Sequence, residues 1–320
     1  MASVAGEHST GHIVQSLVVN IAIAAAKGVA ALITGSGAML AETLHSAADS
    51  GNQLLLLLGV RQARRPPDAR HPLGYGRALY FWSFMVALLL FTGGGVFSIY
   101  EGVHKVMHPE PVDRVWLGMA ILGFSLLLEG GATFSNLREI GKRRGAKPLM
   151  RYLRETKDSD LVVVFGENLA ASVGLALALG ALALAYVTGD ARWDGIGSLA
   201  IGVVLVAVAI FLAVEVQGLL IGEAADQEIE TAAREIADQH QDIGQLVKII
   251  TVQQGPGEVV AMLKVTTRPA LTARQISDAV NQFELALRKR RPEVRWSFIE
   301  VELPAEAGTP RAPVEQRDAG

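Results

Sequence analysis

Cysteine is absent from this 320-residue chain, and charged residues make up only 19% of it. Without thiolates the chain can form no disulfide and offers no sulfur ligand, so any site for a borderline divalent metal must use histidine nitrogen and carboxylate oxygen. Half of the residues are apolar, and the mean hydropathy is +0.32, which lies outside the range of ordinary soluble proteins. The composition therefore predicts an integral membrane protein embedded in a lipid bilayer.

Several motifs that would define other classes are also missing. The sequence has no P-loop, no HExxH and no GxSxG pattern, so ATP-driven transport and the common hydrolase mechanisms find no support. We therefore expect a protein that is not an enzyme, carries no cofactor, binds no nucleic acid and draws its energy from ion gradients. The N-terminal stretch MASVAGEHSTGH has no basic segment and no small-residue cleavage site, which predicts that no signal peptide is removed.

Apolar runs of the length needed to cross a bilayer follow one another along most of the chain. A helix needs about 20 apolar residues to cross about 30 Å of hydrocarbon. Runs of this kind occupy residues 13–34, 38–60, 79–101, 115–136, 160–187 and 195–221. They predict a domain of six transmembrane helices over residues 12–222, preceded by a flexible N-terminal tail over residues 1–11.

The loops between these runs differ in basic charge. The segments 61–78 and 137–159 are rich in arginine and lysine, whereas the loops on the other side hold only Lys105, Arg114 and Arg192. Because basic loops stay on the cytoplasmic side of a membrane, we expect the basic loops and both chain termini in the cytoplasm. The expected location of this multi-pass protein is the cell inner membrane.

The texture of the chain changes after Gly222. Two segments have the periodicity of amphipathic helices and three alternate like half-buried strands: helices at 226–240 and 276–290, and strands at 246–253, 258–267 and 293–302. The order α-β-β-α-β over residues 223–304 predicts a cytoplasmic α+β domain of the ferredoxin-like kind, with its helices on one face of the sheet. Residues 305–320 are rich in Pro, Ala, Glu and Arg and are expected to be disordered.

The second apolar run carries polar residues that are costly in hydrocarbon. In its stretch AETLHSAADSGNQ, Glu42, His45, Asp49 and Asn52 are spaced by three and four residues, so they share one face of a helix. A neutral imidazole and a carboxylate one turn apart, His45 and Asp49, can converge on one borderline divalent cation. Hydrogen bonds between helices are the alternative role for such residues. Because a third acid lies on the same face, we favour a metal site.

A second helix would have to complete the coordination shell. The fifth run opens with VVVFGENLAASVG, in which Glu167 and Asn168 are the strongly polar residues and Ser172 follows one turn later. We therefore predict that Glu167 and Asn168 complete the site of His45 and Asp49. The alternative is that Glu167 lies at the membrane interface and extends its carboxylate to the headgroups.

Two other pairs of residues have an open role. Lys27 in the first run and Glu129 in the fourth could form a proton or ion path, or pair as a structural contact. Asp68 and His71, in the loop PPDARHPLGYGRALYFW, are candidates for a superficial metal site. The aromatic residues that follow them are expected to anchor the third run at the headgroup level.

These features together resemble a known family. The HSAAD of the second run followed by NQ, the HPLGYGR before FW, the six runs and the αββαβ tail are similar to the cation diffusion facilitator family of divalent-metal/proton antiporters, over residues 12–304. The resemblance implies a homodimer whose second and fifth spans form a tetrahedral metal site. It also implies export of metal from the cytoplasm by alternating access, in exchange for protons.

The residues of the implied metal site follow the family pattern only in part. His45 and Asp49 match its first metal-binding pair, whereas the fifth run has Glu167–Asn168 and then Ala171, with no acid four residues after Glu167. In this respect the chain is similar to the branch that contains the zinc transporter nine type, which tends to carry a Glu-Asp pair there. The implied shell is His45, Asp49 and Glu167, completed by Asn168 or water. His45 favours zinc as the transported metal, with cobalt, nickel, iron or manganese as alternatives.

A different class of function is also open at this point. His240 is the only histidine of the C-terminal domain, so the regulatory zinc site that some family members carry there is not expected. This histidine-poor domain and the amide at Asn168 also fit a non-transporting membrane metal sensor or scaffold that acts through its cytoplasmic domain. The two hypotheses differ in one observable, the flux of metal across a membrane.

Overall fold

The computed structural model describes residues 4–35, 37–110, 114–156 and 159–302. At some helical positions only the backbone is described, namely at residues 4–16, 19–20, 37–38, 41–42, 45, 49 and 160. The chain divides into a helical unit, Met1–Ile221, and a C-terminal unit, Gly222–Gly320. The tail predicted to be disordered, residues 305–320, lies outside the described residues.

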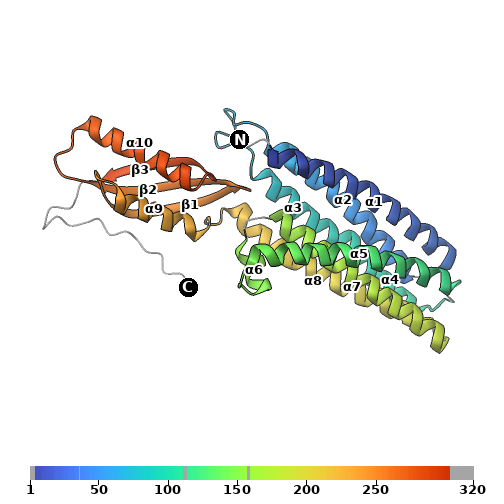
Figure 1. Cartoon of the computed structure of the whole chain (residues 1–320). Coiled ribbons are helices and arrows are strands. Elements are labelled where there is room, and N and C mark those ends of the chain that lie inside the picture. The colour runs from blue at the N-terminus through green and yellow to red at the C-terminus, as the bar shows by residue number, and fades with distance from the viewer. Residues whose placement is uncertain (1–3, 36, 111–113, 157–158, 303–320) are drawn as a thin grey trace. The chain divides into compact units, whose positions relative to one another are not determined.

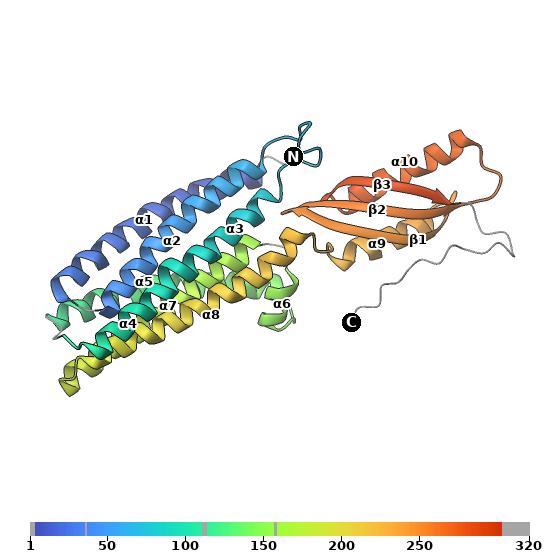
Figure 2. The ribbon, with the colours of Figure 1, turned by 180° about the vertical axis from the view of Figure 1, so that it is seen from behind.

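Long helices run side by side in the helical unit (Figures 1 and 2). Its elements are α1 (Val4–Thr34), α2 (Gly37–Ala63), α3 (Ala78–Leu89), the π-helical segment η1 (Leu90–Val96), α4 (Phe97–Met107), α5 (Val115–Arg144), α6 (Leu149–Glu155), α7 (Ser159–Thr188) and α8 (Arg192–Ile221). α3, η1 and α4 follow one another without a break. The long helices coincide with the predicted apolar runs, because a backbone in hydrocarbon has to satisfy its hydrogen bonds within the helix.

Four helical stretches of the described residues are long and apolar enough to cross a membrane. They are Ala78–Met107, Val115–Arg144, Leu161–Thr188 and Arg192–Ile221. Ile21–Thr34 of α1 is apolar but shorter, and part of α1 and α2 lies beyond the described side chains. The unit is therefore a multi-pass helical membrane domain, while the count of six spans stays a prediction.

Glycine residues let α4 and α8 approach each other closely. A Cβ atom added to Gly102 of α4 would lie 2.6 Å from the nitrogen of Leu199 and 2.9 Å from the oxygen of Gly195, both in α8. One added to Gly202 of α8 would lie 2.8 Å from the nitrogen of Ile99. Side chains do not tolerate such distances, so small residues fix the spacing of these two helices, as they often do in membranes.

Two helical segments lie outside the predicted apolar runs. α1 begins at Val4, inside the stretch 1–11, whose flexibility stays a prediction. Once a helix has started, each further residue adds a hydrogen bond at little cost, which lets polar residues ahead of an apolar run continue it. The short helix α6 lies within the basic loop 137–159 and buries Leu153. The sequence did not predict it, because so short a segment has too few turns to show a helical period.

The C-terminal unit has the predicted element order. It consists of α9 (Gln227–Gln239), β1 (Ile243–Gly255), β2 (Glu258–Thr267), α10 (Ala273–Arg290) and β3 (Val294–Glu302). β1 and β2 pair antiparallel, β2 and β3 pair parallel, and the sheet order is β1-β2-β3. This confirms a mixed α-β-β-α-β segment after the membrane domain.

Local signals in the sequence explain these elements. Gly257 adopts a φ of +66° in the turn between β1 and β2, a conformation that glycine reaches without a steric penalty. Thr272 and Gln275 form a capping box at the start of α10, which satisfies free backbone N–H groups of its first turn. Alternate residues of β2, such as Val259 and Leu263, are buried in one core with both helices. The helices therefore cover one face of the sheet, as predicted.

Candidate metal site

A buried polar contact joins α2 to α7. The Asn52 side chain donates from Nδ2 to Oε1 of Glu167 over 2.5 Å, and the two residues are 0% and 7% exposed. Glu167 therefore points into the helical unit, which rules out the alternative that its carboxylate extends to the membrane interface. Deep burial of a carboxylate among membrane helices is costly, so Glu167 is a candidate functional residue.

The two candidate ligands of α2 lie on the turns next to this contact. The side chains of His45 and Asp49 lie outside the described residues, but both backbone positions belong to α2. Asp49 precedes Asn52 by three residues and His45 precedes Asp49 by four, so helical spacing places the three positions on one face. At Asn52, this face of α2 lies against Glu167 of α7.

The chemistry around Asn52 and Glu167 suits a cation. A carboxylate is a good ligand for divalent metals, and an amide oxygen is a weaker one. Oδ1 of Asn52 is buried and has no hydrogen-bond partner among the residues that the structure describes. Buried polar atoms are rarely left unpaired, so this oxygen and the Glu167 carboxylate are groups that a bound ion could satisfy.

Asn168 takes a different direction from Glu167. Consecutive residues of an α-helix point about 100° apart, since a turn holds about 3.6 residues. The recorded contact of Asn168 is made by its main-chain oxygen, which lies 2.8 Å from Oγ1 of Thr133 on α5. Its role as a metal ligand stays a prediction.

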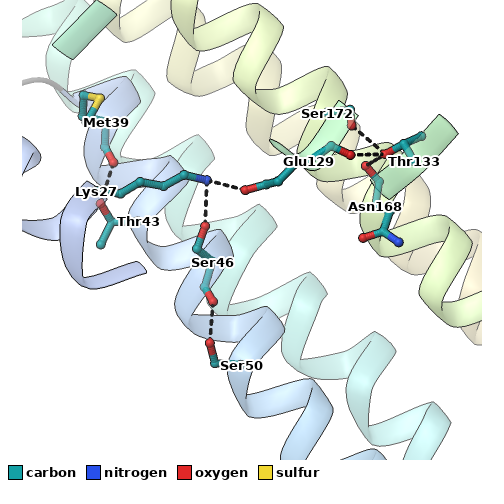
Figure 3. A network of polar contacts seen from close by, with 9 residues as sticks. All are labelled: Lys27, Met39, Thr43, Ser46, Ser50, Glu129, Thr133, Asn168 and Ser172. Atoms are coloured by element: carbon teal, nitrogen blue, oxygen red, sulfur yellow. Dashed lines mark hydrogen bonds and ion pairs between the residues drawn. The ribbon is translucent and has the colours of Figure 1, made fainter. Parts of the chain in front are cut away.

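Lys27 forms the centre of a second polar network, shown in Figure 3. Its ammonium group lies 2.8 Å from Oγ of Ser46 on α2 and 2.9 Å from Oε1 of Glu129 on α5. Lys27 is fully buried, and the Glu129 side chain is 16% exposed. The structure therefore contains the lysine–carboxylate pair, which joins α1, α2 and α5, while a part in a proton or ion path stays a prediction.

Thr133 extends this network to α7. It follows Glu129 by one turn of α5, and its hydroxyl lies 2.9 Å from the main-chain oxygen of Glu129. The same hydroxyl lies 2.8 Å from the main-chain oxygen of Asn168 and 2.7 Å from Oγ of Ser172 (Figure 3). One face of α5 thus contacts both helices that carry candidate ligands, through Lys27 on one side and directly on the other.

The loop with Asp68 and His71 is held by hydrogen bonds to the Asp68 carboxylate. Its Oδ1 accepts from the backbone nitrogens of Arg70 and His71 at 2.9 and 2.8 Å, and its Oδ2 accepts from the Tyr75 hydroxyl at 2.7 Å. The Tyr75 hydrogen bond is the main reason why the pKa of Asp68 lies below its ordinary value. His71 packs its ring on Tyr75, with ring centres 4.1 Å apart. These contacts give Asp68 a structural role in the loop, while metal binding by Asp68 and His71 stays a prediction.

Among the side chains that the structure describes, no three His, Asp or Glu residues converge on one point. His45 and Asp49 are outside that set, so this does not test the predicted shell. Two residues of the region were not assigned by sequence reasoning: Asn52 as the partner of Glu167, and Thr133 as the link to α7. Asn52 could have been found from its place on the His45–Asp49 face, whereas a lone threonine in an apolar helix gives no signal.

A bundle of apolar helices with carboxylate and amide groups buried between them is typical of a multi-pass membrane protein that binds a cation. Comparison with known proteins agrees. Residues 13–221 match the family model described as the cation efflux transmembrane domain. The chain therefore belongs to the cation efflux family, a family of transporters and not of enzymes.

Individual relatives are similar over parts of their length. The chain is 37% identical over 193 residues to the "Proton-coupled zinc antiporter SLC30A9, mitochondrial" of Xenopus laevis, which covers 60% of this chain and 34% of the relative. It is 29% identical over 235 residues to the Homo sapiens protein of the same name, covering 73% and 41%. It is 34% identical over 197 residues to "Metal tolerance protein C4" of Arabidopsis thaliana, covering 61% and 43%. The chain thus spans less than half the length of these relatives.

Proposed function

We propose that this protein exchanges a divalent metal, in the first place zinc, for protons across a membrane, and that it exports the metal from the cytoplasm. The observation that carries the proposal is the contact between Asn52 and Glu167. Asn52 shares its helical face with the positions of His45 and Asp49, so its contact with the buried Glu167 carboxylate supports a site between α2 and α7. The family assignment and the names of the relatives support the same chemistry.

The proposed site consists of His45, Asp49 and Glu167, with Asn168, Asn52 or water in the remaining position. An imidazole nitrogen with two carboxylates suits zinc, and also cobalt, nickel, iron or manganese. Imidazole and carboxylate groups coordinate a metal only when deprotonated. Protons that arrive from the far side therefore compete with the metal for the same atoms, and this competition couples the two gradients.

Alternating access requires the site to open to each side of the membrane in turn. We propose six spans, formed by α1, α2, α3 with η1 and α4, α5, α7 and α8. The basic residues of the loops at 61–78 and 137–159 support cytoplasmic positions for these loops and for both termini. The inner membrane of the cell is the proposed location.

We further propose that the protein acts as a homodimer through the uncovered face of a ferredoxin-like C-terminal domain. Ile250, Met262 and Phe298 are direct neighbours across the three strands and are 45%, 38% and 56% exposed. The next row on this face holds Lys248, Lys264 and Glu300.

A two-fold axis would bring both signs of charge and the apolar row of one copy against those of the other, which is how a self-complementary interface forms. Substituting Phe298→Asp should shift the full-length protein to the monomer in native mass spectrometry. An unchanged dimer would place the interface elsewhere.

Flux measurements test the proposed exchange. The full chain is reconstituted into liposomes that contain a pH-sensitive dye, and a zinc gradient is applied. We expect zinc to cross the membrane with protons moving in the opposite direction, and Asp49→Ala to abolish both fluxes. Asp190→Asn changes an exposed acid of the same domain and should leave both fluxes intact, whereas unchanged flux in Asp49→Ala would contradict the site.

The same experiment decides between transport and a role as a non-transporting sensor or scaffold. Zinc, cobalt, nickel, iron and manganese are each offered in separate vesicle preparations. If none of them crosses the membrane while the protein still binds metal, the proposed exchange is wrong and the sensor hypothesis holds.

A further inference from the structure

The network around Lys27 has a placement that a simple structural contact would not require. Ser46, which accepts from Lys27 at 2.8 Å, lies between the candidate ligands His45 and Asp49 in the sequence of α2. The main-chain oxygen that faces Thr133 at 2.8 Å belongs to Asn168, the neighbour of Glu167. The network therefore ends at the two backbone segments that carry the candidate ligands.

α5 connects these two ends. Glu129 and Thr133 are four residues apart, so they lie on one face of this helix. Glu129 contacts Lys27 over 2.9 Å, and Lys27 in turn reaches α2. Thr133 contacts Asn168 and also Ser172, 2.7 Å away. A path of directional contacts thus runs from α2 through α1 and α5 to α7.

The energetics of buried ion pairs favour a role for this network other than stabilising the contact between the helices. Taking both charges out of water costs much of what their attraction returns, and apolar residues of similar volume often hold a protein together as well or better. What a hydrogen-bonded pair adds is a fixed geometry, because its contacts depend on distance and angle. Metal ligands need such geometry, since coordination tolerates errors of only about 0.5 Å.

We propose that Lys27, Glu129 and Thr133 are positioning residues of the metal site, which hold the ligand-bearing turns of α2 and α7 at the spacing that a divalent cation requires. The inference rests on the site proposed above and extends it to three residues that touch no metal. Groups that orient metal ligands typically change metal affinity by about 10- to 100-fold when they are removed. We therefore expect the loss of these contacts to weaken metal binding without unfolding the protein.

Thr133 offers the sharpest test because the chain contains a matched control. Valine has nearly the shape of threonine but no hydroxyl. The Thr43 hydroxyl, also drawn in Figure 3, donates to the Met39 oxygen of its own helix at 2.8 Å, whereas Thr133 also contacts another helix. The dissociation constant for zinc is measured on the full-length protein in lipid nanodiscs, by competition with a fluorescent chelator.

We expect Thr133→Val to raise this constant about tenfold and Thr43→Val to change it less than twofold. Both variants should melt close to the wild-type temperature. Equal zinc affinity in Thr133→Val and wild type would overturn the positioning role of Thr133.

The ion pair is tested by removing both charges together. The double variant Lys27→Met/Glu129→Gln leaves neither member of this pair behind as an ion without the other, so its thermal transition should stay close to that of wild type. Its zinc dissociation constant should rise at least tenfold, and its transport KM should rise with it. The single variant Lys27→Arg keeps a donor for Glu129 and should retain most of the wild-type affinity for zinc. Wild-type affinity in the folded double variant would reduce the pair to a structural contact.

Failure of this inference is distinct from failure of the proposed function. If wild-type protein binds no zinc in nanodiscs, the metal site itself is wrong. If wild type binds zinc and the Thr133 and double variants bind it equally well, the site stands and only the positioning role is lost. Should the double variant not fold, Thr133→Val still decides the question.

Discussion

Ion pairs in the interior of the helical unit and those of the C-terminal unit are buried to different depths. In the helical unit, the fully buried Lys27 reaches from α1 to Ser46 on α2 and Glu129 on α5. In the C-terminal unit, the ion pairs keep contact with solvent. Some stay within one helix, such as Arg234–Glu230 on α9, whose side chains are 53% and 41% exposed, and others join elements, such as Arg290 of α10 and Glu235 of α9, which are 49% and 45% exposed. The same types of side chain thus join helices in the buried interior of one unit and at the solvated surface of the other.

This difference teaches that the surroundings of a charge, rather than its chemical type, decide what the charge does. A pair in water gains little because solvent screens it and two side chains lose freedom. A charge in the membrane domain has no water to return to, so removing its partner leaves an ion that nothing solvates. Effects of substitution should therefore fall steeply from the first unit to the second.

The largest effect is expected at Glu167. Replacing it by alanine removes a proposed ligand, so zinc flux in liposomes should fall by about a hundredfold or more, beyond the effect of a group that only orients a ligand. Glu139→Ala, at an exposed i,i+4 pair with Arg143 at the end of α5, is the matched control and should retain flux. Comparable loss in the two variants would break the distinction between buried and exposed carboxylates.

The next effect concerns the packing of the membrane domain rather than its charges. Gly102→Ala places a Cβ atom 2.6 Å from the Leu199 nitrogen, so α4 and α8 must separate, at a cost of about 1–3 kcal/mol in the free energy of unfolding. Gly123→Ala on α5 meets no atom within 4 Å and should stabilise the helix by about 0.5–1 kcal/mol. Denaturant unfolding in nanodiscs measures both. A loss of similar size in the two variants would show that the close packing of α4 against α8 is not what makes alanine unfavourable at residue 102.

A smaller effect is expected for the exposed pair in the basic loop. Hydrogen bonds from Arg151 and then Lys147 lower the pKa of Glu155 to about 2. Because this pKa is depressed, the contact stabilises the loop above the ordinary pKa of 4.5 and is lost as the pH falls toward 2. Arg151→Gln should raise the pKa of Glu155 toward its ordinary value, as read from the ¹³C shift of its carboxyl carbon. A pKa that stays near 2 in this variant would show that Lys147 alone sustains the contact.

The smallest effect is expected in the C-terminal unit. Arg234→Gln removes an exposed i,i+4 pair, and such pairs contribute about 0.3–0.5 kcal/mol. The free energy of unfolding of the full-length protein, measured with denaturant and a probe in this unit, should therefore barely change. At high salt the change should be smaller still. A loss above about 1 kcal/mol would contradict the view that surface pairs contribute little here.

How far the sequence predicts this molecule depends on whether a feature is local. β2 begins and ends at the predicted residues, Glu258 and Thr267, because alternation and the Gly-Pro-Gly turn are read directly along the chain. The membrane helices follow from the length of the apolar runs in the same way. The π-helical turns of η1 and the close packing of Gly102 against α8 depend on which helix lies opposite, and no single-chain period encodes that.

The candidate site shows the same limit. The spacing of His45, Asp49 and Asn52 predicts a polar face on α2, and the polar pair of α7 suggests its partner. That Glu167 rather than Asn168 turns toward α2 depends on the rotation of α7, which is set by packing. Thr133 is visible only in three dimensions, because its significance lies in the carbonyl oxygen of Asn168 on another helix.

The most direct test of the central claim is a zinc-bound structure of the full-length protein with anomalous scattering recorded at the zinc edge. The account predicts one peak between α2 and α7, at about 2.0–2.2 Å from a nitrogen of His45 and from oxygens of Asp49 and Glu167, with Asn52 released from its present hydrogen bond or still orienting the Glu167 carboxylate. A zinc peak elsewhere in the helical unit, with Glu167 outside its coordination shell, would contradict it.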